Sequence, residues 1–212
     1  PVIISVLFPA ILQFAGQQSR GLLTVANLPN LLDSFSFFIV IGAAFIPLGI
    51  ASYSIVGEKI EKSLEPLLAT PLTDGEILLG KAIAALLPAS VVMYAGAAVF
   101  MVGVDTVTSG KLGYNYFPNW TFAFLLLVLV PLAVIMSVLY SVIVSSRAND
   151  VRSANSYSIL IFLPLMAIYF ASEIGIISLD INGLLIIAGI LSAIDIALYL
   201  VGTAAFQREE IL

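Results

Sequence analysis

GEKIEKSLEPLLATPLTDGEILLGK, the stretch from Gly57 to Lys81, is a long charged interruption between two apolar runs of membrane length. It contains three lysines and five acidic residues, in a chain of which only 10% is charged. At helical spacing its isoleucine and leucines form one apolar stripe, and its first acidic residues fall on a different face. Pro66 favours the first turn of a helix, and Thr70-Pro71 ends that helix. The sequence therefore predicts a short amphipathic helix between two membrane-spanning helices.

Three interpretations of this predicted helix compete. It could be an ordinary solvated loop with no partner. It could lie on the lipid surface, although such helices are typically rich in lysine and arginine and this stretch is net acidic. In the third interpretation it docks its leucine stripe into a groove on a soluble partner.

The rest of the chain is mostly apolar. Hydrophobic residues make up 61% of its 212 residues, which is typical of a membrane protein. Six apolar runs lie at about residues 1–16, 34–56, 82–104, 120–144, 157–177 and 183–206. The first is shorter than a spanning helix needs, so we expect it to be part of a longer helix. We therefore expect an all-α polytopic membrane protein with one transmembrane domain over residues 1–212. It would be a six-helix bundle with its first helix only partly present, and segment 57–81 would join the second and third spans.

Lysine and arginine are distributed unequally between the two sides of this predicted bundle. Arg20 and Lys111 fall on one side, and the other side carries Lys59, Lys62, Lys81, Arg147, Arg152 and Arg208. Positive residues accumulate on the cytoplasmic side of membrane proteins. The sequence thus predicts a multi-pass protein of the plasma membrane, with segment 57–81 and both termini in the cytoplasm.

The composition argues against several classes of function. The chain contains no cysteine and no histidine, so it has no disulfide framework, no thiol nucleophile and none of the most common metal ligands or general bases. We expect no metal site, no catalytic residues and no enzymatic activity of its own. The net charge of −5 argues against nucleic acid as a partner.

One phosphate-binding motif is misleading. Gly75 to Lys81 has the spacing G-x-x-x-x-G-K, but Ala82 stands where a serine or threonine would bind magnesium. The intervening residues also favour a helix that enters the membrane. We expect Lys81 to extend its ammonium group to the membrane boundary instead.

The charged stretch resembles a known family. Leu64-Glu65-Pro66-Leu67-Leu68-Ala69-Thr70-Pro71, followed by Glu76-Ile77 and Gly80-Lys81, is similar to the signature of type-two ABC exporter permeases. The residues just upstream, Ile60 to Ser63, match the family's pattern only loosely. The tail from Phe206 to Leu212 resembles the end of these permeases.

The resemblance implies that the stretch is the cytoplasmic coupling region after the second transmembrane helix, where the permease touches a separate ATPase subunit. ATP and Mg would be bound by that ATPase, with no cofactor in this chain, and a second permease copy would complete the transporter. The implied ATPase-docking residues are Glu61, Leu64, Glu65, Pro66, Leu67, Leu68, Thr70 and Pro71.

Asp195 lies near the middle of the last apolar run, where an ionised carboxylate is costly unless it is paired or hydrated. It could line the transport path and bind a cation or proton, or it could be a buried acid hydrogen-bonded to a neighbouring helix. This residue supports an alternative function, a secondary transporter driven by an ion gradient. A non-transporting membrane scaffold that recruits a partner is a further alternative.

Overall fold

The computed structural model of the chain describes residues 7–11, 28–60, 74–148 and 150–205. Helices account for nearly all of these residues, and no strand occurs within these four ranges. The helices after residues 7–11 are α2 (Leu28–Ile60), α4 (Asp74–Leu112), α5 (Trp120–Phe124), the π-helix η1 (Leu125–Leu129), α6 (Val130–Arg147), α7 (Val151–Ser158), the 3₁₀-helix η2 (Ile159–Ile161), α8 (Phe162–Glu173) and α9 (Ile181–Ala205). The predicted all-α fold class is confirmed.

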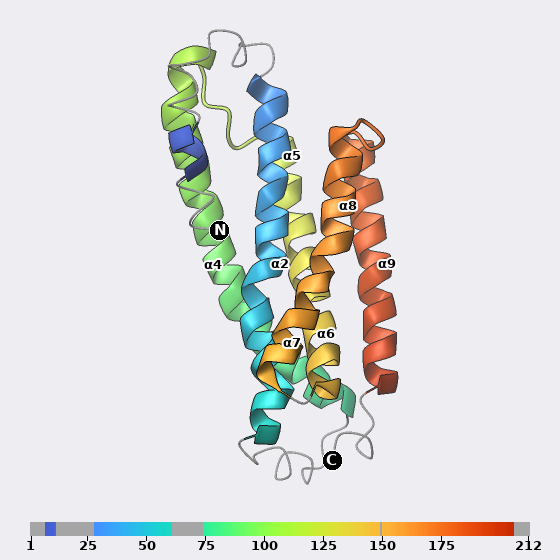
Figure 1. The fold of residues 1–212 in the computed structure, drawn as a ribbon. Coiled ribbons are helices and arrows are strands. Elements are labelled where there is room, and N and C mark those ends of the chain that lie inside the picture. Colours follow the sequence, from blue (N-terminus) through green and yellow to red (C-terminus); the bar gives the residue numbers. More distant parts are fainter. Residues whose placement is uncertain (1–6, 12–27, 61–73, 149, 206–212) are drawn as a thin grey trace.

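The long helices run up and down the bundle in turn (Figure 1). Five of the described helical stretches are long and apolar enough to cross a membrane: Leu28–Gly49, Gly75–Gly110, Trp120–Arg147, Arg152–Glu173 and Ile181–Thr203. We call the end of the bundle where α2 begins the Asp33 end, and the opposite end, where α6 ends, the Arg147 end. Helices α5, η1 and α6 form one of these stretches, and α7, η2 and α8 form another.

Helix α6 lies at the centre of the bundle and packs against α2, α4, α7 and α9. Helices α6 and α2 both carry small buried residues, among them Ala133, Ser137 and Ser141 on α6 and Ala44 on α2. Small side chains let two helix backbones approach closely, which is how helices associate where water supplies no driving force. The Ser137 hydroxyl donates a hydrogen bond to the Ala44 carbonyl oxygen across this contact.

Prolines interrupt the hydrogen bonding of both helices that flank the charged stretch. Pro47 lies inside α2 and Pro88 inside α4. Each removes one backbone N–H and presses on the preceding turn, so a proline inside a helix bends it. Figure 1 shows α4 changing direction near its beginning. The first turns of α4 thereby approach α6 and α9, with which they line a common cavity.

A polar network joins the segments at the Asp33 end. A side-chain oxygen of Asp105 accepts hydrogen bonds from the backbone N–H groups of Tyr116 (2.9 Å) and the residue after it (3.1 Å). The side-chain amide of Asn119 donates to Asp33 (3.2 Å), and its oxygen caps α5. Burial, followed by the nearby charge of Asp33, raises the pKa of Tyr116. Asp33 and Asp105 are therefore helix residues that hold the connection before α5.

Two expected loops are partly helical. The sequence predicts a loop from Asp105 to Asn119, but α4 continues to Leu112 before the chain turns. It also predicts a loop from Ser145 to Ser156, but α6 extends to Arg147 and α7 begins at Val151. The side chain of Asp150 caps α7 by accepting the Ser153 N–H (2.8 Å), and this hydrogen bond is the main reason that the pKa of Asp150 is lowered. Polar residues near the membrane boundary thus continue or cap helices, because the backbone hydrogen bonds do not depend on hydropathy.

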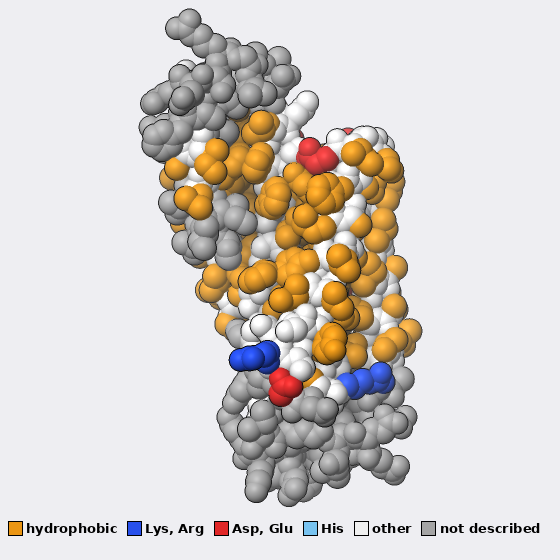
Figure 2. All heavy atoms as spheres, in the orientation of Figure 1, with side chains coloured by type: hydrophobic (Ala, Val, Ile, Leu, Met, Phe, Trp, Pro, Cys, Tyr) orange, Lys and Arg blue, Asp and Glu red, His pale blue; other side chains and the backbone are white. Residues whose placement is uncertain are grey.

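The outer surface of the bundle is apolar along its length. Figure 2 shows hydrophobic side chains over most of the visible described surface, with the visible lysine and arginine side chains only near its lower end. Leu87, Val91, Leu163 and Leu200 are among the large apolar residues that are more than half exposed. An exposed apolar surface of this extent is expected of helices that face lipid or a second subunit.

Candidate functional site

The predicted ATPase-docking residues, from Glu61 to Pro71, lie outside the described residues. The structure does place the two helices that lead into them: α2 ends at Ile60 and α4 begins at Asp74, both at the Arg147 end. Gly75 to Lys81 lies inside α4, so the phosphate-loop spacing falls within the first turns of a helix. Beyond the first turn, the backbone N–H groups of a helix are bonded to its own carbonyl oxygens, so most of this stretch cannot wrap around a phosphate as such a loop does.

Asp195 is the one predicted site residue that the structure describes. Its side chain is buried, with 8% of the residue exposed. Neither carboxylate oxygen has a hydrogen-bond partner among the described residues. Asp195 lies within the apolar stretch Ile181–Thr203. At about 1.5 Å of rise per residue it is roughly 12 Å from the Thr203 end, inside the hydrocarbon layer.

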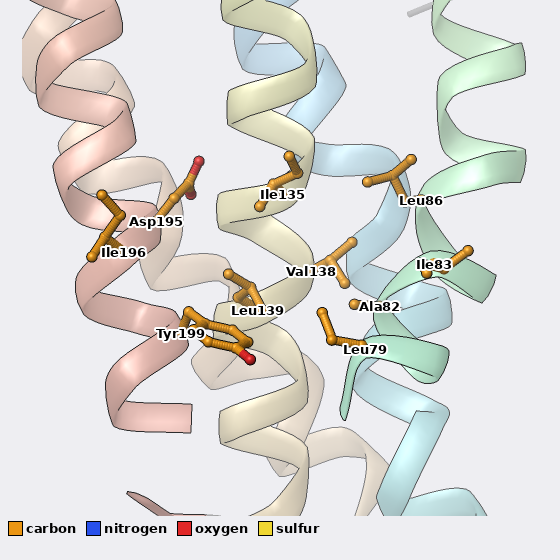
Figure 3. A pocket seen from close by; sticks show the side chains of 10 residues that line it. All are labelled: Leu79, Ala82, Ile83, Leu86, Ile135, Val138, Leu139, Asp195, Ile196 and Tyr199. Carbon is orange, nitrogen blue, oxygen red and sulfur yellow. The ribbon is translucent and has the colours of Figure 1, made fainter. Parts of the chain in front are cut away.

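Asp195 borders a cavity of about 390 Å³ between α4, α6 and α9, and its two carboxylate oxygens lie buried beside that cavity. The lining residues are Leu79, Ala82, Ile83 and Leu86 from α4, Ile135, Val138 and Leu139 from α6, and Asp195, Ile196 and Tyr199 from α9. In Figure 3, Asp195 and Tyr199 project from α9 toward α6, and the α4 residues form the opposite wall. Asp195 is the only charged residue among the ten, and the Tyr199 hydroxyl is the only other side-chain oxygen.

The chemistry of this cavity follows from the contrast between its one acid and its apolar walls. A carboxylate removed from water loses several kcal/mol of solvation unless a counter-charge or hydrogen-bond donors replace that water. Among the described residues the protein supplies neither. The site is thus able to accept a positively charged or hydrogen-bond-donating group, and its walls favour one that is otherwise apolar.

The sequence indicates the acid but not the cavity beside it. Tyr199 lies four residues after Asp195 and therefore on the same face of α9, a spacing that could have indicated it. The α4 wall likewise follows helical spacing from Leu79 through Ile83 to Leu86. Which of the other helices those faces meet is decided by tertiary packing, and no local pattern in the sequence reports it.

The described basic residues on the predicted cytoplasmic side lie in the helices at the Arg147 end. Lys81 is in the early part of α4, Arg147 is the last residue of α6, and Arg152 is in the first turn of α7. Helices α2 and α4 reach this same end from both sides of the charged stretch. These basic residues and the two helix ends that flank the charged stretch are thus gathered at one end of the bundle.

Comparison with known proteins agrees with this architecture. The model of the family described as ABC-2 family transporter protein matches residues 2–198, nearly the whole chain. No curated protein matches the sequence. The match covers all of the described helices up to the last turns of α9, and every residue that lines the cavity except Tyr199. The chain therefore belongs to the ABC-2 transporter family and is a membrane protein of the ABC permease type.

Proposed function

We propose that this chain is the membrane-spanning permease subunit of an ATP-driven ABC exporter. The observation that carries the proposal is the family match over residues 2–198, on a chain with five described helices of membrane-spanning length. ATP and Mg would be bound by a separate ATPase subunit, and this chain would provide the path across the membrane. A second permease copy, identical or related, would complete the transporter.

The charged stretch is the proposed point of energy coupling. Leu67 and Leu68 would make the apolar contact with the ATPase, supported by Leu64, Pro66, Thr70 and Pro71. Glu61 and Glu65 would pair with basic groups on the ATPase. The stretch connects directly to α2 and α4, so a force on it acts on two long helices of the bundle.

The unequal distribution of lysine and arginine supports the orientation. Six of the eight fall on the side of the charged stretch, including Lys81, Arg147 and Arg152 at the Arg147 end. We propose that this end faces the cytoplasm of a cell whose plasma membrane holds the protein, with both termini on the same side. The ATPase would then reach the docking residues from the compartment that contains ATP.

Transport would proceed by rigid-body movement of the bundle. ATP binding would favour one arrangement of the paired ATPases, and the docked helices would transmit that preference to the permeases. The close contact of α2 with α6, and of α6 with α9, supports movement of these helices as a unit. The cavity beside Asp195 would be exposed to the two sides of the membrane in turn.

The absence of cysteine from the sequence gives a clean test of this cycle. Single cysteines at Leu79, Val138 and Tyr199 would each report on a different wall of the cavity. In the reconstituted permease–ATPase complex, we expect the rate of maleimide labelling at these positions to change several-fold when ATP and vanadate trap the ATPase. The change is expected to disappear when Leu67→Asp and Leu68→Asp are added.

The matched control replaces a different pair of leucines. Leu22→Asp with Leu23→Asp introduces the same two charges in the polar stretch that the charge distribution places on the other side of the membrane. This variant is expected to keep the nucleotide-dependent change in labelling. Equal labelling rates with and without trapped nucleotide at all three cavity positions would contradict an ATP-driven cycle.

The buried carboxylate favours one second candidate, a transporter driven by an ion gradient with Asp195 as the ion or proton site. The two candidates differ in their energy source. Solute movement in sealed vesicles that lack an ATPase, abolished by collapsing the ion gradient, would establish the second. Solute movement that requires ATP and persists after the gradient is collapsed would exclude it.

A further inference from the structure

We propose that the cavity between α4, α6 and α9 binds a hydrophobic organic cation, with the Asp195 carboxylate as its counter-ion. This inference rests on the proposed function in one respect: if the chain is an exporter permease, such cations are the class of substrate that it transports. The binding itself concerns the described residues alone and requires no ATPase.

The buried acid is the first observation. Asp195 is 92% inaccessible, lines the cavity, and has no hydrogen-bond partner for either carboxylate oxygen among the described residues. Charged groups inside membrane helices usually pair with one another or with other polar groups. An ionised Asp195 without a partner would be strongly destabilised, and a protonated one would leave its O–H without an acceptor. The oxygens lie buried beside the cavity, so a rotation of the Asp195 side chain toward a cation in the cavity would remove this cost.

The walls decide which kind of cation fits. Calcium takes six to eight oxygen ligands, and magnesium usually keeps several waters. Here the side chains provide oxygens only from Asp195 and Tyr199, and aliphatic residues surround them (Figure 3). An inorganic ion would therefore lose its hydration without replacement. An organic cation that carries its charge on an apolar body would match both the acid and the walls.

The size of the cavity supports a ligand of this class. At about 390 Å³ it falls within the range of about 300–1,000 Å³ that is typical of small-molecule sites. A zwitterionic lipid head group is a poor match, because its phosphate would meet the Asp195 carboxylate, and because Asp195 lies below the head-group level. The aromatic ring of Tyr199, one helical turn from Asp195, adds a face on which a cation can rest.

Two probes of nearly equal shape and opposite charge test the proposal. Tetraphenylphosphonium is a hydrophobic cation, and tetraphenylborate is its anionic counterpart. Binding of each is measured to the purified chain in phosphatidylcholine nanodiscs, with the signal of empty nanodiscs subtracted. We expect saturable binding of tetraphenylphosphonium and no saturable binding of tetraphenylborate to the unaltered protein.

Three variants locate the site. Asp195→Asn removes the charge at nearly constant shape and is expected to weaken cation binding by at least about tenfold, since the loss of one partner of a buried charge pair usually costs more than that. Asp195→Glu keeps the charge and is expected to retain most of the affinity. Ala82→Phe fills the α4 wall without touching the acid and is expected to weaken binding as well.

The matched charge control is Glu173→Gln, which makes the same change from acid to amide at an exposed position at the end of α8. It is expected to leave cation binding unchanged. Equal affinity of the unaltered protein and Asp195→Asn for tetraphenylphosphonium would overturn the proposal, as would equal affinity for the two probes. If Asp195→Asn does not fold, full affinity in Ala82→Phe would overturn it instead.

The proposed function and this inference fail separately. Binding is measured without ATPase or nucleotide, so absence of a cation site would leave the permease role intact. Conversely, a chain that binds the cation through Asp195 but never associates with an ATPase would keep the site and lose the exporter assignment.

Discussion

Gly183 shows how one residue fixes the connection between α8 and α9. It lies in the first turn of α9, where its N–H donates to the side chain of Asp180 (2.9 Å). The Ser178 hydroxyl donates to the same carboxylate, and these two hydrogen bonds are the main reasons that the pKa of Asp180 is lowered. A Cβ atom at position 183 would overlap the backbone carbonyl of Ser178. Only glycine allows the turn to close this tightly.

We predict opposite effects for two glycine-to-alanine changes in α9. Gly183→Ala forces the Ser178 backbone to move and is expected to destabilise the protein by about 1–3 kcal/mol. Gly189→Ala meets no atom within 4 Å and is expected to stabilise the helix by about 0.5–1 kcal/mol. Thermal unfolding of both variants in detergent measures the difference. An unfolding temperature for Gly183→Ala equal to or above that of Gly189→Ala would contradict the described turn.

At the same scale, the sequence could indicate Asp195 but not its surroundings. An acid within an apolar run of membrane length can be recognised from the sequence alone, because burying its charge is costly wherever the helix packs. Its lack of a partner among the described residues depends on side chains of α4 and α6, which are distant in the sequence. The opposing walls of the cavity could therefore be recognised only in the folded protein.

At the scale of helices, α2 and α6 make the most extensive contact between described helices. Both helices carry small buried side chains, and the Ser137 hydroxyl of α6 donates a hydrogen bond to the Ala44 carbonyl oxygen of α2. Ser141 lies one turn further along α6 and is also fully buried, but its hydroxyl has no partner among the described residues. The two serines lie on one helix face and are both buried, but only Ser137 has a described hydrogen-bond partner, which allows a matched comparison.

We predict that Ser137→Ala destabilises the bundle and Ser141→Ala does not. Loss of the Ser137 hydrogen bond is expected to cost about 0.5–1.5 kcal/mol, near the range measured for hydrogen bonds between membrane helices. Ser141→Ala removes a buried hydroxyl that has no described partner, so it is expected to be neutral or stabilising. Unfolding in a denaturing detergent gives the two free energies. An equal decrease in the free energy of unfolding in both variants would show that the Ser137 hydrogen bond does not stabilise the bundle.

Helix ends show where prediction from hydropathy stops. The apolar run at residues 34–56 corresponds to α2, which extends from Leu28 to Ile60. Hydropathy reports the part of a helix that suits the membrane, whereas helix ends are set by caps and turns. Asp150 caps α7 and Asn119 caps α5, and each side chain accepts the backbone N–H three residues further on. Asp and Asn are preferred at this position, so the sequence could have indicated both helix starts. The π-helix η1 before Pro131 has no comparable signal that we recognise.

At the scale of the whole molecule, the sequence predicted the architecture well. Apolar runs separated by polar stretches are sufficient to predict an all-helical membrane bundle, because only helices and closed barrels satisfy backbone hydrogen bonds in lipid. The family was likewise indicated by the motif from Leu64 to Pro71, and the match over residues 2–198 confirms it. The docking role of that motif stays a prediction, since those residues lie outside the described part of the chain.

The proposed function requires that this membrane chain associates with a separate ATPase. The most direct test is quantitative mass spectrometry of the tagged protein, purified gently from native membranes without added nucleotide. We predict a near-stoichiometric ATPase subunit, lost in the Leu67→Asp, Leu68→Asp variant and retained in the Leu22→Asp, Leu23→Asp variant, with all three proteins folded in the membrane. A folded permease that is recovered without any ATPase subunit would contradict the account.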